Sequence, residues 1–100
     1  MHFIIYCLDD SENAGGRDAH YPAHNEYYRV NEYFRFPPVK LLIAGPMTTE
    51  DGKKRIGSML LIEANSLTEA IDFTRNDPFH RNGVWKTVSI RPFLKTTDNR

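Results

Sequence analysis

The sequence predicts an α+β fold in which two helices cover one face of a four-stranded antiparallel sheet. Its strand-like and helix-like segments follow the order strand, helix, strand, strand, helix, strand. That order is the split βαβ, or ferredoxin-like, plan, and right-handed crossovers place both helices on the same face. The strands are apolar on both sides, and a chain of 100 residues has nothing left to cover the second face. A homodimer with opposed sheet faces is therefore expected.

The first strand and the first helix follow from their hydrophobic patterns. Residues 2–8 carry apolar side chains on both faces, as a central strand would. A polar loop over residues 9–16 precedes a helical segment within residues 17–35. Pro22 is tolerated in a first turn, which places the regular start of the helix near Tyr21. The expected core-facing stripe consists of Ala23, Tyr27, Val30 and Phe34.

A hairpin is expected in the middle of the chain. Phe36-Pro37-Pro38 forms a stiff connector to an apolar strand over residues 39–44, which Gly45-Pro46 closes. Asp51-Gly52 suits a reversal between antiparallel strands. The third strand covers residues 56–64, with Met59 and Leu61 on one face and Leu60 and Ile62 on the other. We expect Leu60 and Ile62 to be among the residues of the dimer interface.

A capping box opens the second helix, because Ser66 stands three residues before Glu69. Pro78 ends it, since a proline disfavours helical conformation at the preceding residue and has no N–H to donate. That preceding residue is Asp77, and an Asp-Pro pair is also typical of a simple turn. The expected buried side consists of Leu67, Ala70, Ile71 and Thr74.

The end of the chain predicts a further helical turn and the last strand. The turn covers residues 78–82, with Gly83 as its C-terminal stop. The strand covers residues 84–90, and Pro92 confines the residues after it to an edge or an exit. We expect one domain over residues 1–95 and a polar tail over residues 96–100.

Composition argues against several partners. Thirteen basic residues balance thirteen acidic ones, so the chain has no electrostatic reason to bind nucleic acid or an anionic membrane. No apolar run approaches the ~20 residues of a membrane span, and no secretory signal is recognised. The single cysteine, Cys7, cannot form an internal disulfide, and its apolar neighbours predict an inert thiol. The expected location is the reducing cytoplasm.

Metal and cofactor binding are not expected either. His20 and His24 are four residues apart on one helix flank, a spacing that can share a metal ion. However, the glutamate expected between them and a third ligand nearby are both missing. No glycine-rich phosphate loop is present, and the aromatic residues suit a core better than a base-stacking platform.

Five short motifs occur in one order along the chain, and together they carry a family resemblance. They are Pro22-Ala23-His24, Ala44-Gly45-Pro46-Met47, Gly57-Ser58, Asp77-Pro78-Phe79 and Gly83-Val84. The chain resembles the YCII (YciI-like) family of small, mostly bacterial proteins over nearly its whole length. The resemblance implies a dimeric α+β barrel. The family's characteristic histidine and aspartate match His24 and Asp77, and a frequent arginine matches Arg17.

The resemblance implies an enzyme in which His24 and Asp77 form an acid–base pair. One characterised branch resembles a dehydrochlorinase acting on a chlorinated hydroquinone, so lyase-type chemistry on a small ring is implied. Many members carry a second arginine directly before the Pro-x-His unit, where this chain has Tyr21. If that arginine binds an anionic group in relatives, its absence argues against anion binding here. We expect the small-molecule ligand to be bound by Arg17, Ser58, Gly45 and Tyr28.

Bland alternatives stay open for each of these residues. His24 could equally be a hydrogen-bonded structural histidine at the boundary of the core. Asp77 could be a turn residue, and Ser58 a small residue where a strand meets a helix. The alternative function is a non-catalytic ligand-binding or accessory module in which the pair is structural. Loss of turnover with retained ligand binding after a change of His24 would favour the enzyme.

Overall fold

The computed structural model describes the backbone of residues 1–34 and 39–100, and the side chains of residues 1–29 and 39–100. The connector expected at Phe36-Pro37-Pro38 lies outside the described residues. The elements in chain order are β1 (His2–Asp9), α1 (Gly16–Phe34), β2 (Lys40–Thr48), β3 (Arg55–Glu63), α2 (Leu67–Arg75), α3 (Pro78–Arg81) and β4 (Trp85–Phe93). The predicted order is confirmed, and the predicted extra helical turn is α3.

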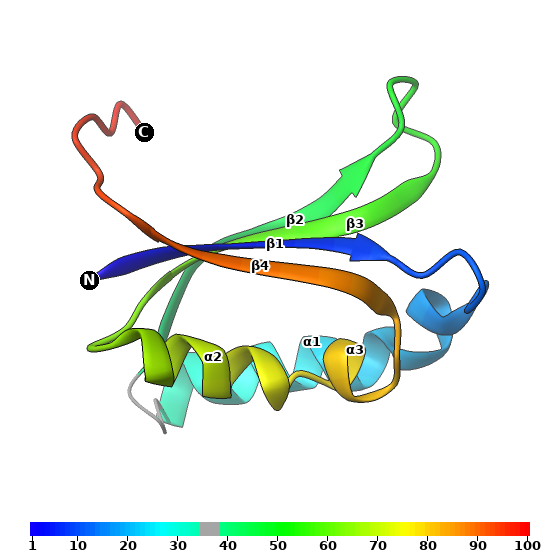
Figure 1. The fold of residues 1–100 in the computed structure, drawn as a ribbon, viewed down its shortest axis with the longest axis horizontal. Coiled ribbons are helices and arrows are strands. Elements are labelled where there is room, and N and C mark those ends of the chain that lie inside the picture. Colours follow the sequence, from blue (N-terminus) through cyan, green and yellow to red (C-terminus); the bar gives the residue numbers. More distant parts are fainter. Residues whose placement is uncertain (35–38) are drawn as a thin grey trace.

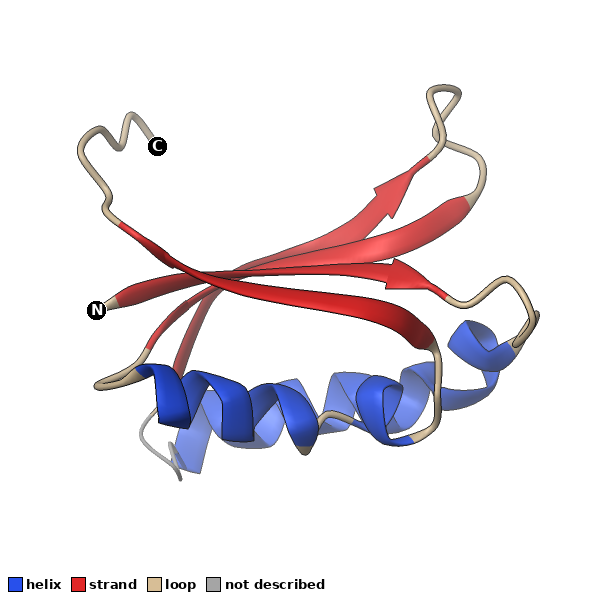
Figure 2. Ribbon diagram, in the orientation of Figure 1, coloured by secondary structure: helices blue, strands red, loops and turns tan. Residues whose placement is uncertain are grey.

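The sheet has the strand order β2-β3-β1-β4 with antiparallel neighbours throughout, which is the ferredoxin-like arrangement. All three helices of the described chain lie on one face of this sheet, and the opposite face carries none of them (Figure 1). The two-layer arrangement is clearest in Figure 2, where helices and strands differ in colour. The predicted fold class is therefore confirmed.

The core lies between the helices and the inward side of the two central strands. Ile5 of β1 pairs with Leu60 of β3, and Phe3 pairs with Ile62, so these side chains point to the same face. Each is at most 1% exposed. Burial of a side chain of this size contributes about 1.5–3 kcal/mol to the free energy of unfolding. The other apolar residues of this core are Cys7, Val39, Ala64, Ala70, Phe73, Phe79, Val84 and Trp85.

The opposite face of the sheet is also apolar, and we call it the open face. Tyr6 and Leu8 of β1 stand on it and are 46% and 38% exposed. The register adds Ile4, Ile43, Met47, Met59 and Leu61. Leu60 and Ile62 were expected as interface residues, but this was wrong because their side chains lie beneath the helices. A two-sided strand does not reveal from its sequence which side the helices will cover.

The first helix differs from expectation in its start and in its buried side. It begins at Gly16 rather than near Tyr21, so Pro22 lies inside it and not in its first turn. Its first turn is formed by the hydrogen bond from the Ala19 N–H to the Gly15 carbonyl, 3.0 Å long. A proline removes only the bond to the carbonyl four residues earlier, and here the helix continues through it.

The predicted core stripe of α1 was only partly right. Ala23 is exposed, Tyr27 is half-buried and His24, expected on the flank, is buried with 8% of its surface exposed. The side chains of Val30 and Phe34 lie outside those that the structure describes. The helix is therefore rotated so that a histidine, rather than an alanine, faces the core.

The second strand runs through Gly45-Pro46 to Thr48 instead of ending there. The prediction treated the proline as a stop, but β2 is an edge strand, and an edge position does not require every N–H to join the ladder. The other edge strand, β4, likewise contains Pro92.

The capping box of α2 is present. The Glu69 N–H donates to Ser66 Oγ at 3.2 Å, and Glu69 Oε2 accepts from the Asn65 N–H at 2.9 Å. Leu67 was expected to be buried, but it is 44% exposed at the first position of the helix, whereas Ala70 and Thr74 are buried as expected and Phe73 is buried with them. Among the described residues, no helix is long and apolar enough to cross a membrane.

Candidate active site

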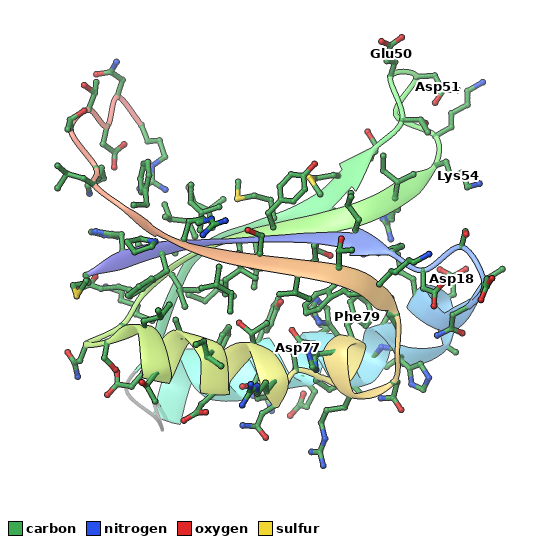
Figure 3. The ribbon with its side chains drawn as sticks, in the orientation of Figure 1. Asp18, Glu50, Asp51, Lys54, Asp77 and Phe79 are labelled. Atoms are coloured by element: carbon green, nitrogen blue, oxygen red, sulfur yellow. The ribbon has the colours of Figure 1, made fainter. Side chains whose placement is uncertain are left out.

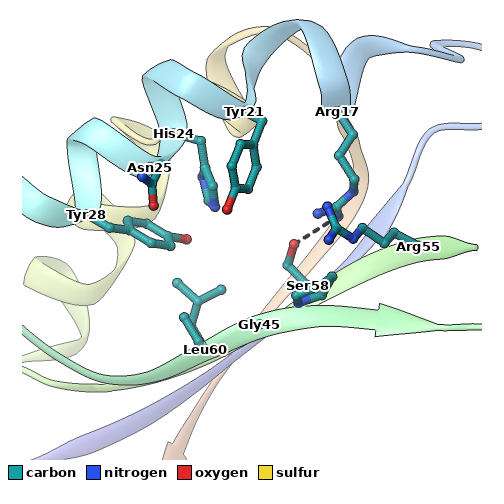
Figure 4. A pocket seen from close by; sticks show the side chains of 11 residues that line it. Arg17, Tyr21, His24, Asn25, Tyr28, Gly45, Arg55, Ser58 and Leu60 are labelled. Atoms are coloured by element: carbon teal, nitrogen blue, oxygen red, sulfur yellow. Dashed lines mark hydrogen bonds between the residues drawn. The ribbon is translucent and has the colours of Figure 1, made fainter. Parts of the chain in front are cut away.

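A cavity of about 170 Å³ lies between α1 and the strands β2 and β3. Five of the residues expected to form a site line it: Arg17, His24 and Tyr28 from α1, Gly45 from β2 and Ser58 from β3 (Figure 4). The sixth, Asp77, lies behind His24 and does not line the cavity. The fold thus brings together segments that are far apart in the sequence.

The side chains of His24 and Asp77 meet at the expected distance. His24 Nδ1 lies 2.6 Å from Asp77 Oδ1, and the carboxyl group is 1% exposed. Asp77 follows α2 and is the N-cap of α3, where its Oδ1 also accepts the Phe79 N–H at 2.9 Å. It lies on the helical side of the sheet, next to Phe79 (Figure 3). The Asp-Pro pair is therefore a helix start as well as the partner of a histidine.

Aromatic rings hold the His24 imidazole in place. It stacks on Phe79 with 3.8 Å between ring centroids and 2° between planes, and Tyr28 tilts against it at 4.1 Å. Because Nδ1 contacts a carboxylate, that nitrogen carries the proton of the neutral ring and donates it. Nε2 is then left with a lone pair. His24 can accept a proton from a ligand in the cavity at Nε2.

Arg17 joins the start of α1 to the sheet. Its guanidinium donates from Nε and Nη2 to the two carboxylate oxygens of Asp9 at 2.8 and 2.7 Å. Nη2 also donates to the Gly57 carbonyl and to Ser58 Oγ, both at 2.9 Å. The guanidinium carbon lies 5.0 Å from the centre of the Phe79 ring. This paired geometry fixes the arginine at one end of the cavity.

Ser58 is a buried polar junction, and not merely a small residue. Its Oγ accepts from Arg17 Nη2 and from Trp85 Nε1, the latter at 3.3 Å, and the residue is 4% exposed. Gly45 contributes differently. Gly45 pairs with Met59, whose side chain is on the open face, so a side chain at position 45 would also point to the open face. Gly45 therefore borders the cavity with its backbone.

Tyr28 places a protonated hydroxyl beside the pair. Burial, followed by the negative charge of Asp77, raises the pKa of Tyr28 well above its usual value. Within the described residues, neither the Tyr28 hydroxyl nor Asp77 Oδ2 has a hydrogen-bond partner at regular geometry, although both atoms are buried. A side-chain hydrogen bond to Asp77 also contributes to the raised pKa of Tyr28, so the protonated hydroxyl lies within reach of the Asp77 carboxylate.

Sequence reasoning missed several residues of this site, among them Leu60, which it had placed in a dimer interface. Arg55 and Asn25 line the cavity, Asp9 holds Arg17, and Trp85 donates to Ser58. Asn25 could have been found, because it stands one residue after His24. Arg55, Asp9 and Trp85 come from strand ends, and no pattern within a single segment indicates them. Tyr21 also lines the cavity, with 47% of its surface exposed.

The geometry gives no support to a shared metal at His20 and His24. In the described part of the chain, no three His, Cys, Asp or Glu side chains are grouped as a metal site would need. The Nδ1 atom of His24 is engaged by Asp77. That the protein needs no metal or cofactor stays a prediction.

Cys7 is predicted to be unreactive in the folded protein. Burial, together with the charges of Asp77 and Asp9, raises the pKa of its thiol to about 12, against a partial opposing effect of Arg17. A thiol reagent such as dithionitrobenzoate should label Cys7 only after unfolding. One equivalent of rapid labelling in the native state would contradict this.

The same shift makes stability depend on pH. In the unfolded chain the thiol ionises near 9.0, whereas in the folded chain its pKa is about 12. The contribution of Cys7 to the free energy of unfolding is therefore full below pH 9 and is lost as the pH rises towards 12.

Comparisons with known proteins agree with this architecture. The sequence profile of the YCII-related domain matches residues 1–94. Protein YciI of Escherichia coli O6:H1 is 30% identical over 100 residues, covering 95% of this chain and 98% of the relative, and Protein YciI of Shigella flexneri gives the same values.

A solved structure is also similar. It is the 5-chloro-2-hydroxyhydroquinone dehydrochlorinase TftG from Burkholderia phenoliruptrix AC1100, in complex with 2,5-dihydroxybenzoquinone. Its TM-score is 0.78 at 30% sequence identity, and the match covers 94% of each chain.

Proposed function

The chain belongs to the YCII family, and on this premise we propose that it is a small-molecule enzyme that uses His24 and Asp77 as an acid–base pair. The observation that carries the proposal is the 2.6 Å contact between His24 Nδ1 and Asp77 Oδ1, with the imidazole at the wall of a cavity. The family membership and the likeness to a dehydrochlorinase support it.

The proposed mechanism is general base catalysis by His24. Its Nε2 accepts a proton from the bound substrate, and the ring becomes an imidazolium. The Asp77 carboxylate stabilises that charge and keeps the ring in one orientation. A positioned acid–base group of this kind typically contributes about 10²–10⁴-fold to a rate.

The proposed substrate is a single-ring compound. The cavity of about 170 Å³ is close to the ~150 Å³ that holds one benzene ring in an engineered protein. We further propose lyase chemistry of the dehydrochlorinase type. Such an elimination transfers one proton to a base, and the electron pair that the proton leaves behind forms a new π bond while the C–Cl bond breaks and its electron pair leaves with chloride. It needs no oxidant or reductant.

A two-stage screen tests this function. Single-ring compounds, chlorinated hydroquinones among them, are first tested for a rise in melting temperature, because a ligand that binds only the native state stabilises it. Those that bind are then tested for chloride release and for a change in absorbance. Turnover that disappears in His24→Gln supports the enzyme. Binding without any turnover supports the alternative, a ligand-binding module in which the pair is structural.

We also propose that the protein is a homodimer formed through the open face. Tyr6, in the middle of that face, is 46% exposed in the single chain, so Tyr6→Asp should leave the fold intact and dissociate the dimer. Light scattering should report a dimer for the wild type and a monomer for the variant. Thr68→Asp, on the exposed side of α2, should remain a dimer. A wild-type monomer at micromolar concentration would refute this.

The expected partners and location complete the proposal. The balanced charge of thirteen basic and thirteen acidic residues favours a small-molecule partner over nucleic acid. The single buried thiol of Cys7 suits a reducing compartment, and we propose the cytoplasm.

A further inference from the structure

We propose that Arg55, Arg17 and Ser58 form an anion-binding end of the cavity, so that the ligand carries a carboxylate or a deprotonated hydroxyl on its ring. This inference rests on the proposed function only in taking the ligand to be a single-ring compound. It assigns that ligand a charge and an orientation. We call these three residues the anion end.

Ser58 supplies a hydrogen-bond donor to this end. Its Oγ already accepts two hydrogen bonds, from Arg17 Nη2 and from Trp85 Nε1. A hydroxyl group has two acceptor sites and one proton to donate, so both acceptor sites are filled. Among the described residues its proton has no acceptor, and Ser58 lines the cavity. An oxygen atom of a ligand bound in the cavity can therefore accept the hydrogen bond that the Ser58 hydroxyl donates.

Arg17 is held as a fixed donor beside it. Nε and Nη2 are occupied by Asp9, the Gly57 carbonyl and Ser58, whereas Nη1 makes no hydrogen bond within the described residues. The Asp9 carboxylate compensates the charge of Arg17. Arg17 therefore provides a hydrogen-bond donor of fixed direction but no net charge. The excess positive charge of the anion end must come from another residue.

Arg55 provides that excess charge. It opens β3 opposite Thr48 of the edge strand, and in the described part of the chain it forms no ion pair. Its side chain lines the cavity and lies next to that of Arg17, on the same side as Ser58 (Figure 4). None of the described residues that line the cavity carries a carboxylate. An arginine fork beside a second guanidinium is suited to a planar oxyanion.

The surroundings make this end distinct from the general surface. An adjoining groove shares Arg17 and Arg55 with the cavity, but it carries charges of both signs: Asp9, Asp10, Asp18, Lys53 and Lys54. The other end of the cavity is bordered by Leu60 and the ring of Tyr28. A ligand with its anion at Arg55 and its ring at Leu60 would lie alongside His24.

Three compounds of nearly the same shape test the charge. Benzoate, benzamide and benzamidine are anionic, neutral and cationic at neutral pH, and their binding can be measured by ligand-observed NMR titration. We expect benzoate to bind most tightly and benzamidine least. Arg55→Gln should weaken benzoate binding roughly tenfold, as for the loss of one charge-assisted hydrogen bond, and leave benzamide nearly unchanged. The benzoate preference should shrink as salt is added.

Lys54→Gln is the matched control. It removes the same charge from the neighbouring residue, which lines the groove but not the cavity. It should leave benzoate binding unchanged. An equal loss of benzoate affinity in both variants would mean that the anion responds only to the overall positive charge of this surface. The proposal is overturned by that result, by equal affinity for the three compounds, or by no benzoate binding up to its solubility limit.

The outcome also separates this inference from the proposed function. His24→Gln should retain the preference for benzoate over benzamide, because the anion end does not include His24. A charge preference that depends on Arg55, found in a protein with no turnover of any compound, would refute the enzyme and leave the anion end standing.

Discussion

Replacing His24 by glutamine is expected to lower kcat/KM by about 10²–10⁴-fold on a substrate found by the screen. Glutamine keeps a polar side chain but has no nitrogen that can take up a proton near neutral pH. Because His24 contacts Asp77 at 2.6 Å and lines the cavity, the loss should fall on kcat more than on KM. Steady-state kinetics with the purified variant measures it.

Two variants make the comparison specific. Asp77→Asn should also lower kcat, since it removes the charge that stabilises the imidazolium, yet asparagine can still cap α3 and accept the Phe79 N–H. His20→Gln changes a histidine one turn earlier that does not line the cavity, and it should keep wild-type kinetics. Wild-type kinetics in His24→Gln would end the acid–base proposal.

A large loss of stability is expected from Phe79→Ala. Phe79 is 0% exposed, and its ring contacts His24 on one side while Trp85 packs against it edge-on with 5.8 Å between centroids. Truncation of a buried phenylalanine typically lowers the free energy of unfolding by about 3–5 kcal/mol. For a domain of this size the melting temperature should fall by more than about 12 °C.

The control uses the same residue type at an exposed position. Phe93 ends β4 with 37% of its surface exposed, and Phe93→Ala should cost less than about 1 kcal/mol. Urea unfolding of both variants at one protein concentration gives the comparison, so that the proposed association of two copies contributes equally to both measurements. Equal losses in the two variants would show that the ring of Phe79 is not part of the core.

The fold could be predicted because each segment carries its own signal. The two-sided strand at residues 2–8, the capping box at Ser66 and Glu69, and the helical turn after Pro78 are local patterns, and the structure contains all of them. The errors arose where tertiary context decides. Gly45-Pro46 looks like a strand end until the strand is known to lie at the edge of the sheet.

The buried side of α1 was mispredicted for a related reason. A hydrophobicity pattern assigns Ala23 to the core and His24 to its flank. In the structure the histidine is buried, because Asp77 satisfies its nitrogen and Phe79 stacks on its ring, while Ala23 faces solvent. Both partners lie more than fifty residues away in the sequence, so no helical wheel contains them.

The site could be predicted as far as its motifs reach. His24, Asp77, Arg17 and Ser58 were found because they belong to short patterns shared with the family. Arg55 was not, because its position over the cavity depends on how the hairpin between β2 and β3 stands against α1.

The prolines of the two edge strands bear on how the protein avoids aggregation. An edge strand offers unpaired N–H and C=O groups to any other extended chain, and a growing β-fibril adds strands there. Pro46 in β2 and Pro92 in β4 have no N–H to offer, and each interrupts the row of donors along its edge. Strand-by-strand growth is thus hindered at both ends of the sheet. In the dimer proposed above, association would instead use the open face, where side chains rather than backbone groups select the partner.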